Sequence, residues 1–136
     1  MDLKSGIIKI NGEIFAPGYT FEDFQRSTFF EGQDAVRIIR LNDTVKIGGN
    51  NFITSLFFRN KILYMLSMMC VDIDIPFSEE IKRKQFHDAI LAKNGLSPET
   101  FFDWGNIKSV YDPKGNVSSI NICLLYTSDA ADEGLG

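Results

Sequence analysis

The sequence contains little histidine, cysteine and tryptophan. Its 136 residues include one histidine, two cysteines and one tryptophan. With His87 as its single histidine, the chain cannot build a metal site from several imidazoles. His87 follows Arg83 and Lys84 by one helical turn, and these cations would repel a metal ion, so we expect a solvated surface residue. Cys70 lies in an apolar stretch, where a small buried hydrophobe is expected, and no disulfide framework is predicted.

Motifs for phosphate binding and for secretion are also missing. Gly48 and Gly49 are not followed by the lysine and hydroxyl residue of a phosphate-binding loop, and no G-x-G-x-x-G unit is present. No serine lies in a nucleophile-elbow pattern. Residues 1–10 lack the apolar core and the cleavage site of a secretory signal, so a cytoplasmic location is expected. These absences predict no cofactor, no nucleic-acid partner and no membrane partner.

The totals are those of an ordinary globular chain. Hydrophobic residues make up 44% and charged residues 24%, and the length predicts a single domain. Phenylalanine is abundant, with 12 copies, and each buried aromatic side chain removes about 150–250 Å² from water. Such a composition can fill one hydrophobic core.

The most apolar stretch, residues 51–71, organises the rest of the chain. It reads as two strands joined at Arg59, Asn60 and Lys61, because β-branched and aromatic residues fill both arms and the joint is short and polar. A membrane span is disfavoured, since each central cation costs roughly 2.5–3.5 kcal/mol on insertion scales. A buried helix over residues 62–70 stays open, because a continuous apolar run fits either structure.

Turn and cap residues divide the N-terminal part. Residues 7–10 and 13–15 form a predicted hairpin around Asn11-Gly12, whose positions tolerate positive φ. Thr20 is expected to cap a short helix, with Asp23 in the reciprocal position of a capping box.

Further strands are predicted on both sides of the central pair. Residues 35–41 and 44–47 are expected to continue into it as an antiparallel meander, with residues 48–51 as a loop. Two more strands, residues 107–111 and 117–122, are joined by a proline–glycine turn. Residues 101–105, rich in aromatics, are read as a connection.

One convincing helix is predicted over residues 79–94, capped by Ser78 and closed by Gly95. On a helical wheel its apolar residues gather on one half and its polar residues on the other, which is typical of a helix lying on a sheet. The expected buried half holds Ile81, Phe86, Ala89, Ile90 and Ala92, and the expected wet half holds Arg83, Lys84, His87 and Asp88.

Two groups of residues are candidate sites. Asp72 and Asp74 alternate along a predicted strand end about 6.5–7 Å apart, a spacing that suits a hard cation or paired-acid hydrolysis, and equally a charged strand terminus. Trp104, beside Phe101 and Phe102, can plug the sheet end or anchor a partner. Trp104 is therefore a candidate partner-binding residue, together with Asp112 and Lys114 of the last turn.

Residues 104–122 (WGNIKSVYDPKGNVSSINI) resemble the C-terminal signature, WGxIxSxYDPKGxxSSIxI, of a family of small uncharacterised bacterial proteins. The resemblance implies a nearly complete bacterial domain and assigns no activity. Residues 123–133 (CLLYTSDAADE) resemble a translated sequencing adapter, so residues 1–122 are the expected domain and 123–136 a non-native tail. Three of the 18 acids lie in that tail, and without them 15 acids face 14 bases, so the net charge of −4 falls to −1.

The fold class expected is α+β, an antiparallel sheet of about six to eight strands with one main helix packed on one face. The function predicted is a small cytoplasmic protein-binding domain without catalytic activity, of the immunity type that neutralises a toxin by binding it. The alternatives are a metal-dependent hydrolase using Asp72 and Asp74, and a small-ligand-binding domain with a pocket in the Phe-rich core.

Overall fold

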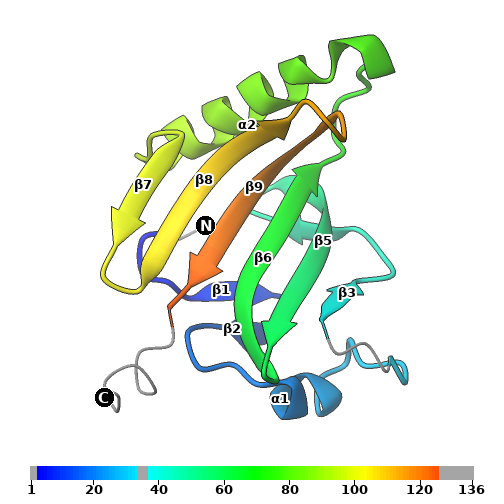
Figure 1. The fold of residues 1–136 in the computed structure, drawn as a ribbon, viewed down its shortest axis with the longest axis vertical. Coiled ribbons are helices and arrows are strands. Elements are labelled where there is room, and N and C mark those ends of the chain that lie inside the picture. Colours follow the sequence, from blue (N-terminus) through cyan, green and yellow to red (C-terminus); the bar gives the residue numbers. More distant parts are fainter. Residues whose placement is uncertain (1–2, 34–36, 126–136) are drawn as a thin grey trace.

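The computed structural model describes residues 3–33 and 37–125 and has the expected α+β architecture (Figure 1). Seven strands form one antiparallel sheet, and two more form a separate hairpin. The strands are β1 Ile8–Ile10, β2 Glu13–Phe15, β3 Ile38–Arg40, β4 Val45–Ile47, β5 Asn50–Arg59, β6 Ile62–Cys70, β7 Glu99–Phe102, β8 Gly105–Asp112 and β9 Val117–Leu124. The helices are α1 Phe21–Gln25, the 3₁₀ turn η1 Phe77–Glu79 and α2 Ile81–Lys93.

The central hairpin is confirmed, and the helical alternative for residues 62–70 is wrong. β5 and β6 pair antiparallel around a turn in which Asn60 and Lys61 have φ of 52° and 64°. Positive φ at both central residues is the requirement of the hairpin turn that matches the twist of paired strands. The polar turn at residues 59–61 therefore explains why the apolar residues 51–71 form two paired strands.

The first strands do not form the predicted meander. β3 and β4 both pair with β5, at opposite ends of it, and no pairing joins β3 to β4 in the described part of the chain. β5 has ten residues and can accommodate both three-residue strands end to end. It begins at Asn50, inside the predicted loop, because Gly48 and Gly49 alone make the turn from β4.

Two C-terminal strands differ from their expected bounds. Residues 101–105 are not a connection, because β7 pairs with β8 from Glu99 to Phe102. β9 extends past the domain boundary predicted at Ile122, and its last residue, Leu124, is buried. The non-native origin of residues 123–136 stays a prediction.

One face of the sheet carries the core. Side chains alternate along each strand, and the inward set includes the fully buried Phe52, Leu56, Leu66, Ile107 and Ile122. Helix α2 packs against β8 and β9 at one end of this face. Hairpin β1–β2 and α1 cover the other end of this face, where Phe24 and Phe58 lie in ring contact.

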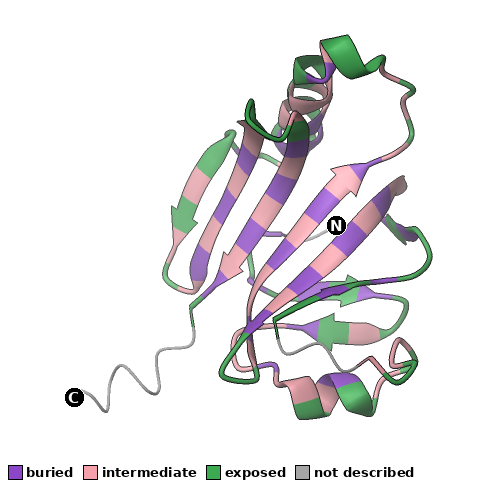
Figure 2. Cartoon of the chain, turned by 45° about the vertical axis from the view of Figure 1, so that its right-hand side comes forward, coloured by how far each residue is buried: buried purple, intermediate pink, exposed green. Residues whose placement is uncertain are grey.

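The opposite face, called here the open face, has no helix over it within the described residues (Figures 1 and 2). Its side chains are half-buried by one another and appear as the intermediate bands on the strands in Figure 2. No helix in the described part is long and apolar enough to span a membrane.

Helix ends follow the sequence signals in part. The capping box of Thr20 and Asp23 is confirmed by reciprocal bonds of 3.0 Å. Gly95 closes α2 with φ of 74°. Ser78 is not the cap of α2, because it lies inside η1 and the helix starts after Glu80 without a side-chain cap.

Candidate functional site

The face of α2 that contacts the sheet includes residues predicted to be wet. Glu80, His87 and Leu91 are buried, and the Arg83 side chain is 11% exposed, so these positions form one stripe at helical spacing. Of the residues assigned to the buried half, Ile90 is buried as predicted, but Ile81 is 43% exposed. The predicted orientation of the helix is therefore wrong in part. Polar groups could enter the interface because the sheet offers a hydrogen-bond partner to most of them.

His87 is fully buried and is not a solvated surface residue. Its Nε2 accepts a hydrogen bond of 3.0 Å from the backbone N–H of Cys70, and its Nδ1 is buried without a partner in the described structure. Burial, aided by the Arg83 guanidinium, lowers the pKa of His87 to about 4. The imidazole is therefore neutral at pH 7 and serves as an acceptor for the end of β6.

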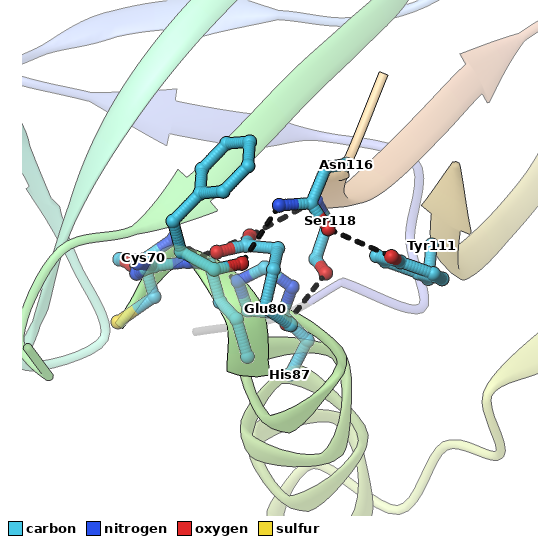
Figure 3. A network of polar contacts seen from close by, with 8 residues as sticks. Cys70, Glu80, His87, Tyr111, Asn116 and Ser118 are labelled. Atoms are coloured by element: carbon cyan, nitrogen blue, oxygen red, sulfur yellow. Dashed lines mark hydrogen bonds and ion pairs between the residues drawn. The ribbon is translucent and has the colours of Figure 1, made fainter. Parts of the chain in front are cut away.

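Arg83 and Glu80 form a buried ion pair that joins the helix to two strands (Figure 3). Arg83 Nε donates to Glu80 Oε2 at 3.0 Å, and Arg83 Nη1 donates to the Cys70 carbonyl. Glu80 Oε2 accepts from the Ser118 N–H at 3.2 Å, and the Ser118 hydroxyl donates to the Glu80 carbonyl at 3.1 Å. A buried pair is tolerated when further hydrogen bonds satisfy both charges, and these bonds do so.

A second set of contacts holds η1 against the last hairpin (Figure 3). Asn116, with φ of 53°, donates from Nδ2 to the Phe77 carbonyl at 2.8 Å. Its Oδ1 accepts from the Tyr111 hydroxyl at 2.7 Å. The network as a whole clamps the N-terminal end of α2 onto β6 and the β8–β9 hairpin.

This network brings Cys70, Asp72 and His87 together, residue types that can form a nucleophilic site, but their contacts oppose that chemistry. The thiol contacts Asp72 Oδ2 at 3.5 Å, whereas the imidazole acceptor is taken by a backbone N–H. Burial raises the pKa of the Cys70 thiol, which disfavours the reactive thiolate. A catalytic thiol needs a base within reach and a lowered pKa, so the arrangement is that of a structural clamp.

Asp72 and Asp74 do not lie on a strand, because β6 ends at Cys70. Both are exposed, and the Asp72 carboxylate accepts from the backbone N–H and the Nδ2 of Asn51 at 3.1 and 2.9 Å. These bonds lower the pKa of Asp72. Within residues 3–33 and 37–125, no group of three or more potential metal ligands gathers. The metal role of Asp72 and Asp74 stays a prediction, and the observed role of Asp72 is to accept hydrogen bonds from Asn51.

The three predicted partner-binding residues lie at two ends of the sheet. Trp104, in the β7–β8 turn, stacks on Phe102 with ring centroids 4.9 Å apart and donates from Nε1 to the Lys4 carbonyl at 2.9 Å. Asp112 and Lys114 are exposed in the β8–β9 turn, where Asp112 Oδ1 accepts from the Lys114 N–H. Trp104 thus secures the N-terminal segment, and the structure does not bring it together with the other two.

Sequence reasoning missed a basic cleft at the corner of the open face. Its volume is about 680 Å³. It is lined by Arg37, Ile38, Phe57, Phe58, Arg59, Asn60, Lys61 and Tyr64. Cations separated by more than twenty residues meet there because β3 pairs beside the β5–β6 turn. The cleft could have been found from the sequence only by predicting that β3 pairs with β5 and not with β4.

Comparison with known proteins gives one fold relative. No family model matches the sequence, and no curated protein matches it. Among solved structures, it is similar to a chain of "Rhs1-CT in complex with cognate immunity protein RhsI1", with a TM-score of 0.54 and 14% identity. The match covers 94% of this chain and 90% of the other. At this identity the similarity concerns the fold alone, and it extends over nearly the whole of both chains.

Proposed function

We propose that this protein is an immunity-type protein that binds a toxin domain and neutralises it without catalysis. The observation that carries the proposal is the fold similarity to a chain of a complex between Rhs1-CT and its cognate immunity protein, which covers 94% of this sequence. That complex is an assembly of two proteins, so the similarity favours a protein partner for this chain.

The polar groups of the structure support a binding role. The cluster of Cys70, Asp72 and His87 has its acceptor nitrogen occupied and its thiol buried. The open face, by contrast, presents a broad sheet surface on one side of the molecule (Figure 1). A binding protein needs such a surface and does not need a reactive cleft.

A growth assay tests the proposal. The product of the adjacent gene, as the candidate toxin domain, is expressed in a bacterial host, with and without this protein. We expect the toxin domain alone to arrest growth, co-expression to restore it, and the two purified proteins to form a 1:1 complex. Failure to protect, together with failure to bind the purified toxin domain, would overturn the proposal.

The same assay separates the two components named in the comparison. If this chain corresponded to Rhs1-CT, its own expression would arrest growth, whereas an immunity-type protein is harmless alone.

A matched control is the variant Arg83→Met/His87→Leu, in which the clamp of α2 is removed. We expect it to lose protection together with thermal stability, which shows that protection requires the folded protein.

A further inference from the structure

One row of apolar side chains crosses the open face near the β5–β6 turn. Ile38 pairs with Phe57, and Phe57 pairs with Met65, so the row runs over β3, β5 and β6. Directly paired residues project from the same side of a sheet, so these three form one continuous strip, called here the apolar row. Ile38 is 53% exposed.

The basic cleft adjoins this row. Arg37, Arg59 and Lys61, called here the basic corner, line it together with Phe57 and Tyr64. The Arg59 guanidinium lies 4.3 Å from the centre of the Tyr64 ring, which positions its charge over an aromatic surface. The Phe57 ring also contacts the Tyr64 ring, and the two ring centroids are 6.2 Å apart.

Among the described residues, no acidic side chain pairs with the cations of the basic corner. No acidic side chain lines the cleft within the described ranges, and no ion pair involves these three cations there. Over residues 1–122, 15 acids face 14 bases, so a group of three cations is a local concentration of charge. Unpaired like charges repel one another, and a surface that keeps them favours a partner of opposite sign.

The composition of the corner is that of a strong binding surface. Arginine and tyrosine are enriched among residues that dominate interface energetics, and they act best beside well-packed apolar contacts. Here Arg59 and Tyr64 are already stacked, so little side-chain freedom is lost when a partner binds. The apolar row supplies the contact area next to them.

We propose that the basic corner and the apolar row form the docking surface for the protein partner, and that the partner meets it with an acidic surface. Carboxylates of the partner pair with Arg37, Arg59 and Lys61, and an apolar side chain covers Phe57 and Tyr64. This inference rests on the proposed function and deepens it, because it names the face used and the charge of the toxin domain that occupies it.

A second copy of this chain fits the surface less well. Two copies related by a two-fold axis through the corner would place its cations opposite the same cations of the other copy. Like charges placed across an interface oppose association. A homodimer through this face is therefore an outcome that contradicts the proposal.

The experiment uses isothermal titration calorimetry to measure how tightly this protein binds the purified candidate toxin domain, which is the product of the adjacent gene. The test variant is Arg37→Glu/Arg59→Glu, and the control is Lys93→Glu, at an exposed position of α2, which covers the other face of the sheet (Figure 1). We expect the double variant to weaken binding by about 30-fold or more, as for a hot-spot residue. The control should stay within about threefold of the wild type.

A salt titration of the wild type gives a second readout that needs no variant. Affinity should fall as sodium chloride is raised from about 50 mM to about 300 mM, because salt screens exposed charge pairs. Circular dichroism and melting temperature confirm that the variants fold, as expected for exposed side chains.

Each remaining outcome contradicts a distinct statement. If the wild type does not bind the toxin domain, the proposed function fails and the docking surface fails with it. If the wild type binds and the double variant binds equally, or if only Lys93→Glu weakens binding, the docking surface is wrong and the proposed function stands. A homodimer in light scattering that the double variant dissociates assigns the face to a second copy instead.

Discussion

Acidification should destabilise this protein through His87. The imidazole is fully buried, and its pKa is lowered to about 4, whereas a histidine in an unfolded chain titrates near 6.5. Between these values the unfolded chain binds a proton that the folded chain excludes. The stability contributed by neutral His87 is therefore complete above pH 6.5 and decreases as the pH falls toward 4. At 1.36 kcal/mol per pH unit the loss reaches about 3 kcal/mol.

The variant His87→Gln separates this effect from the titration of carboxylates. A glutamine oxygen can accept the Cys70 N–H and does not titrate, so carboxylates contribute equally to both proteins and cancel in the comparison. The free energy of unfolding is measured by urea titration at pH 7 and pH 4.5, with fluorescence of the single tryptophan as the probe. The wild type should lose about 2.5 kcal/mol more than the variant over this range.

A direct titration gives an independent check. Because the chain has one histidine, its imidazole resonances in an NMR spectrum report His87 without ambiguity. Parallel pH profiles for the two proteins, or an NMR midpoint near 6.5, would refute the reasoning. Either result would mean that the imidazole reaches water in the folded protein.

Three further changes have defined consequences for thermal and chemical unfolding. Gly6→Ala should destabilise the protein and alter its fluorescence, because the added Cβ would lie 2.6 Å from the Trp104 ring and Gly6 has φ of 78°. Thr20→Ala removes the cap of α1 and should cost about 1 kcal/mol in urea unfolding. Deleting residues 126–136 should leave the melting temperature unchanged within about 2 °C, whereas deleting 123–136 removes the end of β9 and should lower it by roughly 10 °C.

The hairpins could be predicted because each turn contains residues that favour the backbone conformation of a tight turn. Asn11, Gly12 and Asn60 adopt positive φ, a conformation that asparagine and glycine tolerate, and the flanking apolar residues then pair. The strands of the β8–β9 hairpin were predicted from its proline–glycine turn, in which the structure has positive φ at Asn116. Local chemistry is sufficient wherever the partner of a strand is its neighbour in the sequence.

The orientation of α2 could not be predicted, because its inward stripe is polar. Hydrophobic periodicity assigns Arg83 and His87 to water, yet both are stabilised by backbone groups of Cys70, which lies far away in the sequence. The buried apolar residues of the helix, Ile90 and Leu91, lie one turn after His87 and belong to the same inward face. The candidate surface at the basic corner was missed for a related reason, since its cations are brought together by the pairing of β3 with β5.

The sharing of β5 by β3 and β4 has a consequence for solubility. An open sheet edge can recruit a strand from another molecule and so begin a fibril, and short edge strands resist this. Here one edge is divided into two strands of three residues each, and the other edge, β7, has four residues and an ion pair from Glu99 to Lys108. The open face of the sheet can therefore stay uncovered, because the short edge strands offer little backbone with which a strand of another molecule could pair.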